Sequence, residues 1–344
     1  MKYDVEADWL LLKTCNFRCS YCFFAADFSS SKINIYGSPN QWKEGFEATG
    51  KTWLLHITGG EPSLYPGFVE LCHQLTQKHY LSINSNLTHH CVKDFAQRIN
   101  PERVHFINAS IHFEERLKRG LLNVFIQRVQ ELRNANFNLL LSLVMTPYVV
   151  SNFSEIVRQF EVHGLLPIPK IIRGIHEGKH YPESYSVEQK RVISDYLMIA
   201  RHKYESVINS MGESASIDMF SDSRFLDGIK DYRGRLCSAG HRFVFITPNG
   251  TVVRCGPSEV FGNILFKDVN LLNAPKFCDT WYCPYFCEKY SVQNPTLKNN
   301  KLRLMINKYA HFRGKILMMY YLMKTDGSLE IRNKITSKLR KYFL

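Results

Sequence analysis

Residues 9–22 read WLLLKTCNFRCSYC, and this stretch decides the fold. Trp9–Lys13 is mostly apolar and predicts a β-strand. Three cysteines follow it at the spacing C-x3-C-x2-C, namely Cys15, Cys19 and Cys22. Three thiolates on one short loop can bind three irons of a [4Fe–4S] cubane and leave the fourth iron open to another molecule. Zinc is the alternative, but it needs a fourth ligand to close a tetrahedron, and the first His of the chain is His56.

A second motif follows the next apolar run, and it reads Thr58-Gly59-Gly60-Glu61-Pro62. Two glycines after a strand let the backbone approach a ligand closely. The Glu61 carboxylate provides an acceptor for an ammonium group. A turn without any ligand is the alternative interpretation of these five residues.

Together the two motifs resemble those of the radical S-adenosylmethionine (SAM) superfamily. The resemblance implies that SAM chelates the open iron through its amino and carboxylate groups. An electron donor such as flavodoxin or ferredoxin would reduce the cluster, which cleaves SAM to methionine and a 5′-deoxyadenosyl radical. That radical abstracts a hydrogen atom from the substrate. By the same resemblance Tyr21 packs near the adenine, and Gly59–Pro62 corresponds to the family's GGEP motif, which holds the SAM amino group.

Apolar, β-rich runs alternate with helical patterns through the first half of the chain. The predicted strands are Trp9–Lys13, Trp53–Ile57, Tyr80–Asn84, Val104–Ile111, Phe137–Met145 and Ile168–Ile172. The predicted helices include Gly67–Lys78, Val92–Arg98, Leu121–Asn134, Ser154–His163 and a later one over Val187–Asn209. Alternation of this kind predicts parallel strands joined by right-handed crossovers. We therefore expect an α/β fold, a partial (β/α)6 TIM-like barrel that binds its ligand at the carboxyl ends of the strands.

Further SAM contacts are expected where the third and fourth strands end. Relatives often carry a Thr-Asn-Gly-like sequence beside the ribose at the position of Asn84-Ser85-Asn86. Asn86 replaces the glycine, and asparagine readily adopts the left-handed backbone conformation such a turn needs. Ser110 and His112 end the fourth strand and are candidates for the ribose hydroxyls, whereas Val144 or Met145 would line the adenine. A purely structural role is the alternative for all of these residues.

Five more cysteines form a second group between residues 237 and 287. Strands over 243–246 and 252–254, joined by Pro248-Asn249-Gly250, predict a β-hairpin that brings Cys237 and Cys255 to one end. Two of the cysteines at 278, 283 and 287 would complete a site for zinc or a [4Fe–4S] cluster. The C-x12-G-x4-C pattern resembles the twitch domain, a shortened relative of the SPASM domain, which implies one auxiliary [4Fe–4S] cluster. We favour Cys283 and Cys287 over Cys278 as the last two ligands.

The chain divides into a barrel (1–175), a helical connector (176–236), a small cluster-binding domain containing the hairpin (237–290) and a basic tail (291–344). Residues 295–344 hold twelve Lys or Arg and two Asp or Glu, and so contribute most of the net charge of +13. Apolar residues at helical spacing in this tail predict amphipathic helices that dock on the barrel or lie on an anionic membrane surface. No recognisable nucleic-acid module accompanies the charge, which argues against a nucleic-acid partner. The start of the sequence shows no secretory signal, so we expect a cytoplasmic protein with possible peripheral membrane contact.

The expected substrate is a small polar or carbohydrate-type molecule. The alternative is a peptide or protein, although the leader-recognition domain that peptide-modifying relatives often carry does not fit before residue 8. A structural zinc- or cluster-binding protein without catalysis is the competing class. The glycine-rich loop at residues 58–62 and the alternating strands and helices argue against that class.

Overall fold

Six parallel strands form the centre of the molecule. The structure, a computed structural model, describes residues 1–22, 33–207, 219–226, 232–255, 259–278, 283 and 291–292. The parallel strands are β1 (Val5–Leu12), β2 (Trp53–Gly59), β3 (Tyr80–Ser85), β4 (Val104–Ser110), β5 (Leu139–Val144) and β6 (Pro167–Lys170). They neighbour one another in chain order, and β6 ends the sheet without closing it. The predicted α/β partial barrel with six parallel strands is therefore confirmed.

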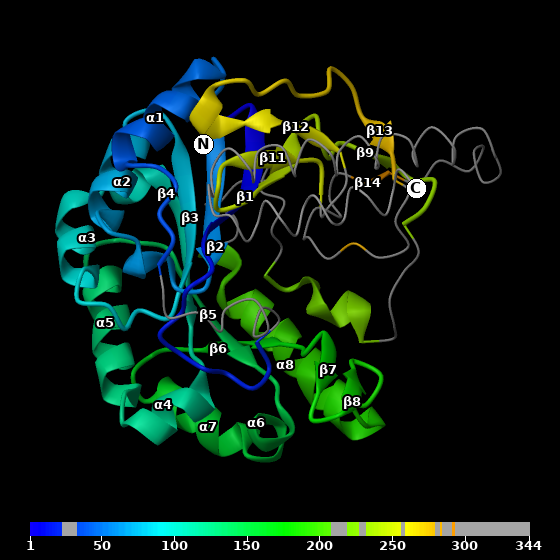
Figure 1. The fold of residues 1–344 in the computed structure, drawn as a ribbon. Coiled ribbons are helices and arrows are strands. Elements are labelled where there is room, and N and C mark those ends of the chain that lie inside the picture. Colours follow the sequence, from blue (N-terminus) through cyan, green and yellow to red (C-terminus); the bar gives the residue numbers. More distant parts are fainter. Residues whose placement is uncertain are drawn as a thin grey trace.

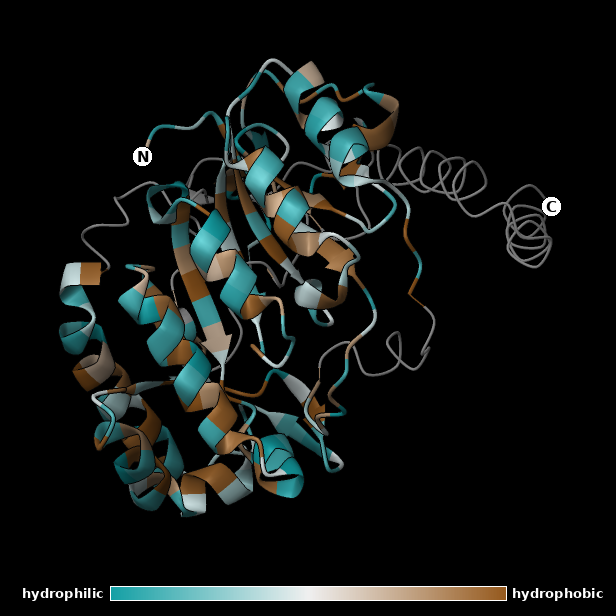
Figure 2. Cartoon of the chain, turned by 90° about the vertical axis from the view of Figure 1, so that its left-hand side faces the viewer, coloured by the Kyte–Doolittle hydropathy of each residue, from teal (hydrophilic) through white to brown (hydrophobic). Residues whose placement is uncertain are grey.

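Helices cover one face of this sheet (Figure 1). The α-helices are α1 (Pro39–Ala48), α2 (Phe68–Leu75), α3 (Val92–Arg98), α4 (Phe113–Arg119), α5 (Leu122–Asn134), α6 (Pro147–Ser151), α7 (Phe153–Glu161) and α8 (Val187–Lys203). Short 3-10 helices are η1 (Pro62–Leu64), η2 (Pro101–Arg103), η3 (Ser221–Phe225) and η4 (Ile264–Phe266). Figure 2 looks onto the helix layer, where hydrophilic residues alternate with hydrophobic ones.

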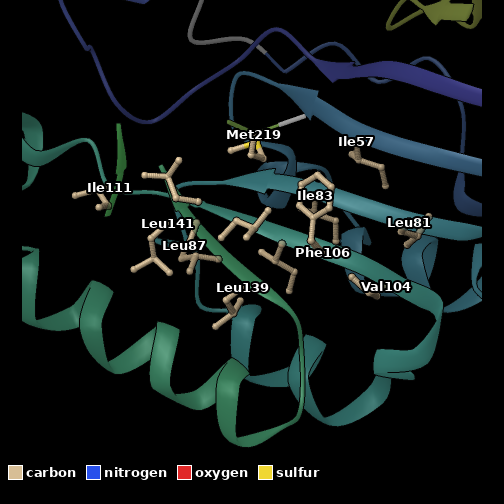
Figure 3. Packing of buried hydrophobic residues seen from close by; sticks show 14 of the residues in the cluster. Ile57, Leu81, Ile83, Leu87, Val104, Phe106, Ile111, Leu139, Leu141 and Met219 are labelled. Atoms are coloured by element: carbon tan, nitrogen blue, oxygen red, sulfur yellow. The ribbon is translucent and has the colours of Figure 1, made fainter. Parts of the chain in front are cut away.

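The main core lies between the sheet and these helices. Trp9 of β1 packs against Trp42 and Phe46 of α1, with ring centroids 4.7 and 5.1 Å apart. Figure 3 shows another part of this core, in which side chains from neighbouring strands, such as Ile57 of β2 and Ile83 of β3, pack together. Burial of this apolar surface is the main force that holds the helices on the sheet.

Strand β1 begins at Val5, four residues before the predicted start. Two acidic residues, Glu6 and Asp8, interrupt the apolar pattern there, and they lie on the face opposite to that of Trp9 because strand side chains alternate. Glu6 is nevertheless fully buried, since its carboxylate lies 3.5 Å from Nε2 of His56 on β2. Nδ1 of His56 lies 2.5 Å from Oγ of Ser82 on β3. A buried polar network thus replaces the apolar residues from which strands are normally predicted.

The predicted hairpin joins the same sheet. Its strands, β10 (Phe243–Ile246) and β11 (Thr251–Val253), pair antiparallel, and Gly250 adopts a positive φ of 84° in the turn between them. Strand β10 also pairs parallel with β1, and β12 (Val260–Asn263) continues the sheet beyond β11. This nine-stranded arrangement was not predicted. The boundaries of the four sequence domains stay predictions.

Two smaller sheets complete the described structure. One has the order β13-β9-β14, from β13 (Lys276–Phe277), β9 (Leu236–Cys237) and β14 (Ser291–Val292). The other pairs β7 (Gly174–His176) with β8 (Lys179–Tyr181). Within the described ranges, no helix is long and apolar enough to cross a membrane. The predicted tail helices lie outside the described residues.

Asp8 is an acidic residue of β1 with an unfavourable environment. It neighbours His56 of β2 in the strand register. Burial raises the pKa of Asp8 to about 6, although His56 opposes this effect. The folded state therefore favours protonated Asp8. As the pH rises and Asp8 ionises, the protein loses stability, and this loss is complete only above pH 6.

We expect Asp8→Asn to stabilise the protein at pH 8. The asparagine keeps the shape of protonated Asp8 and removes the charge, so the free energy of unfolding should rise by about 1–3 kcal/mol. Because unfolded Asp8 titrates near its ordinary pKa, the gain should shrink from pH 6 downward and vanish below about pH 4. Urea denaturation at several pH values measures this difference. A variant that is less stable at pH 8 would show that ionised Asp8 makes a favourable contact.

Candidate active site

A cavity of about 500 Å³ lies at the carboxyl ends of β1 to β4, the edge at which the sequence predicts a ligand. The residues that line it are Cys15, Phe17, Arg18, Cys19, Tyr21, Cys22, Thr58, Gly59, Gly60, Glu61, Asn84, Ser85, Asn86, Asn108, Ser110 and His112. Every site residue predicted from the first cysteine group, the glycine motif and the two strand ends is among them, except Pro62. Pro62 instead begins the 3-10 helix η1.

The glycine pair packs directly against the cysteine loop. The backbone N–H of Gly60 donates to the Leu12 carbonyl, and that of Glu61 donates to the Thr14 carbonyl, both at 2.9 Å. A Cβ on Gly59 would lie 2.1 Å from the Leu12 oxygen, and one on Gly60 would lie 2.1 Å from the Thr14 oxygen. Gly59 also has a φ of 134°, which side chains rarely permit. The two glycines therefore allow contact between two loops, besides the expected approach to a ligand.

Glu61 holds the ends of two elements together. Its Oε1 accepts hydrogen bonds from the Ser63 backbone N–H (3.1 Å), the Ser63 hydroxyl (2.6 Å) and the Ser85 hydroxyl (2.7 Å). Its Oε2 accepts from the Asn86 backbone N–H at 2.7 Å. Burial raises the pKa of Glu61, and these hydrogen bonds oppose the rise. An ionised carboxylate has about four acceptor positions, so Oε2 keeps one for a further donor.

Asn86 connects β3 to the cysteine loop. Its Nδ2 donates to Oδ1 of Asn16 at 2.8 Å, and Asn16 in turn donates to the Thr88 hydroxyl at 2.7 Å. The left-handed residue of this turn is Leu87, with a φ of 55°, so the expectation that Asn86 adopts this conformation is wrong. The Asn86 amide instead bridges two loops, which a glycine could not do.

His112 lies between β4 and the cysteine loop. Its Nδ1 is 3.4 Å from Sγ of Cys19 and 3.0 Å from the hydroxyl of Tyr21. Burial, together with the nearby Arg116 charge, lowers the pKa of His112 to about 3. The imidazole is therefore neutral, and it offers hydrogen bonds to the cavity without a charge.

Asn108 is a cavity residue that the sequence analysis missed. Its Nδ2 donates to Oδ1 of Asn84 at 2.8 Å, and Asn84 donates to the Thr58 hydroxyl at 3.3 Å. The Oδ1 of Asn108 is buried and has no hydrogen-bond partner. Alternation along β4 places Asn108 on the same face as Ser110, and this was the signal that could have identified it.

The second cysteine group also comes together. Cys237 and Cys283 are buried in a small cluster with Phe243, and Cys255 and Cys278 pack against it. Burial raises the pKa of Cys255 to about 12, and the three neighbouring cysteines add to the rise. Cys278, which the sequence analysis ranked below Cys283 and Cys287, thus lies with the others. Cys287 lies outside the described residues.

The described cysteines of the two groups are not arranged around one point. In the part of the chain that the structure describes, no three Cys, His, Asp or Glu side chains converge as the ligands of one metal ion do. A tetrahedral zinc ion requires such convergence, because all its ligands bind the same atom. Each thiolate of a cubane binds a different iron, so cluster ligands lie around the cluster.

Comparisons with known proteins agree with this geometry. Residues 9–159 match the family model of the Radical SAM superfamily. The radical SAM match contains the cysteine loop, the glycine motif and the ends of β3 and β4. No curated protein matches the sequence significantly.

Two solved structures resemble this chain in fold over more of its length. Streptococcus suis SuiB bound to S-adenosylmethionine superposes with a TM-score of 0.50 and 13% identity, over 89% of this chain and 68% of SuiB. A second structure, native anSMEcpe with bound AdoMet and the Cp18Cys peptide, has a TM-score of 0.52 and 15% identity, over 97% of this chain and 99% of anSMEcpe. At these identities the likeness concerns the fold.

Gly60→Ala tests the contact between the glycine motif and the cysteine loop. The new Cβ would collide with the Thr14 carbonyl, so either the cysteine loop moves or the protein loses about 1–3 kcal/mol of stability. We expect less bound iron and weaker SAM binding than in the wild type, measured by iron analysis and equilibrium dialysis.

Gly50→Ala is the matched control for this substitution. Gly50 also has a positive φ, of 69°, but a Cβ there meets no atom within 4 Å. It should lose a little stability and keep its iron and SAM affinity. Equal effects of the two substitutions would mean that the close contact at Gly60 is unimportant for the site.

Proposed function

We propose that this chain is a radical SAM enzyme, in which Cys15, Cys19 and Cys22 bind a [4Fe–4S] cluster with one iron open to SAM. The observation that carries the proposal is the single cavity shared by the cysteine loop and the glycine motif, within the region that matches the family. When bound, the cluster supplies the electron that cleaves SAM to the 5′-deoxyadenosyl radical.

The remaining cavity residues suit the polar parts of SAM. Glu61 presents an oxygen with free acceptor capacity beside the cysteine loop, which suits the SAM ammonium. Asn84, Ser85, Asn86, Ser110 and neutral His112 offer uncharged donors and acceptors, which suit ribose hydroxyls. The ring of Tyr21 is held by His112, on which it stacks with centroids 6.2 Å apart, and remains our candidate for the adenine contact.

For the second cysteine group we propose one auxiliary [4Fe–4S] cluster. Cys237, Cys255, Cys278 and Cys283 form one small cluster of side chains, and this grouping supports them as its ligands. Four protein ligands would leave no iron open, which favours electron transfer over direct substrate binding. Cys278 therefore takes the place that the sequence analysis assigned to Cys287. A structural zinc site on the same cysteines is the alternative.

The substrate class rests on weaker support. We propose a small polar or carbohydrate-type molecule, which is one of the two substrate classes of the relatives that the sequence resembles. A structure of similar fold, anSMEcpe, contains a bound peptide, so a peptide or protein substrate is the second candidate. Either reaction requires an external reductant such as flavodoxin or ferredoxin.

Loss of Cys19 tests the class of enzyme. Anaerobic wild-type protein with dithionite and SAM should form 5′-deoxyadenosine, whereas Cys19→Ala should form none, because a cluster on two thiolates is not held. Cys72→Ala is the control, since Cys72 is fully buried in α2, away from the cavity. Product at the wild-type rate from Cys19→Ala would overturn the assignment.

Iron analysis tests the auxiliary cluster and its ligands. The wild type should bind about eight irons, and Cys15, Cys19 and Cys22 changed together to Ala should leave about four. Cys278→Ala should also lower the content toward about four, whereas Cys287→Ala should keep about eight. The reverse result for these two variants would restore Cys287 as the ligand. About four irons and one zinc in the wild type would indicate a structural zinc site.

A further inference from the structure

Helix α4 supports the cysteine loop from behind through two arginines. Nη1 of Arg119 donates to the Asn16 carbonyl at 2.8 Å. The guanidinium carbons of Arg116 and Arg119 lie 5.3 and 5.0 Å from the ring centroid of Phe17, the middle one of the three residues between the first two cysteines. Both cations therefore contact the loop that we propose to hold the SAM cluster.

The two arginines differ in their surroundings. Arg119 is partly exposed, and its charge is matched by Glu115 at 3.0 Å. Arg116 is fully buried, and its guanidinium lies 4.2 Å from the ring centroid of Phe125. Across the ranges that the structure covers, no carboxylate forms an ion pair with Arg116. Cys19, Tyr21 and Glu61 lie close enough to interact with its charge.

Neutral groups satisfy only part of the Arg116 guanidinium. Its Nε donates to the Ile111 carbonyl at 2.5 Å, and Nη2 donates to the carbonyls of Asn86 and, at 3.3 Å, Ser110. Its Nη1 is buried and has no hydrogen-bond partner. Burying a cation that forms no direct ion pair is unfavourable, so a positive charge at this place requires an explanation.

Glu61 provides one negative charge near Arg116, and the cofactor would bring more. Three cysteines that bind iron do so as thiolates, and among these three Cys19 lies close enough for its charge to interact with Arg116, in addition to Glu61 and Tyr21. We propose that Arg116 is the buried counter-charge of the SAM cluster, a positioning residue that compensates its thiolates and favours the reduced cluster over the oxidised one. This proposal rests on the proposed function.

The alternative is a purely structural role. The guanidinium ties together the ends of β3 and β4 through three carbonyls, and that function depends on its donors, not on its charge. The two roles can be separated, because lysine keeps the charge, whereas glutamine keeps amide donors without the charge.

The test is a redox titration of the reconstituted full-length protein, followed by EPR of the signal that changes on SAM addition. In Arg116→Gln, loss of the positive charge should make reduction harder, so the ratio of reduced to oxidised cluster at a fixed potential should fall roughly tenfold, a shift of about 59 mV to more negative values. Arg116→Lys should keep a potential close to that of the wild type. Arg119→Gln is the matched control and should also stay close, because solvent screens that exposed charge.

Each outcome decides between the two roles. Unchanged potential in Arg116→Gln, or equal shifts in Arg116→Gln and Arg116→Lys, overturns the counter-charge. If Arg116→Gln takes up no SAM cluster, its redox potential cannot be measured. Iron uptake and the melting temperature of the iron-free protein are then compared between the variants. If Arg116→Lys takes up iron and Arg116→Gln does not, while the two iron-free variants melt at the same temperature, the proposal is supported. Equal loss of iron uptake in both variants overturns it. A wild-type protein that binds no cluster would instead overturn the proposed function.

Discussion

Two backbone hydrogen bonds organise the proposed cofactor site. They run from the residues just after β2 to the end of β1 and the loop that follows it. They join Gly60 to Leu12 and Glu61 to Thr14, and they form because neither glycine carries a Cβ in the contact. Parallel strands end at the same edge of a sheet, but their loops do not meet unless the backbones fit together. Here the contact brings the cysteine loop and the Glu61 carboxylate to one cavity.

Glu61 in the cavity and Arg116 behind the cysteine loop are fixed charges that exist before any cofactor binds. Glu61 is stabilised by four neutral donors, and Arg116 by three carbonyls. Dipoles that are held by strand ends and loops need little reorganisation when a charged ligand arrives. Burying the charges of Glu61 and Arg116 costs free energy, and the large apolar core on the helix side of the sheet offsets this cost.

Strand β1 connects this site to the second cysteine group. It pairs with β2, which leads to the glycine motif, and on its other side with β10. Phe243 of β10 neighbours Glu6 of β1 in the register, and it also packs in the cluster that contains Cys237 and Cys283. Both proposed metal sites are therefore supported by adjacent strands of one sheet.

The sequence by itself determined the six parallel strands and nearly all the cavity residues, because apolar runs and the residues that follow them are local patterns. The early start of β1 escaped prediction because Glu6, which is buried, and Asp8, which is partly buried, look like surface residues until His56 and Ser82 lie beside them. Arg116 was not identified from the sequence, because no local pattern marks a buried arginine. The pairing of β10 with β1 and the position of Cys278 were decided by tertiary structure alone. Contacts between segments far apart in the chain depend on which surfaces bury one another, and no local pattern records that.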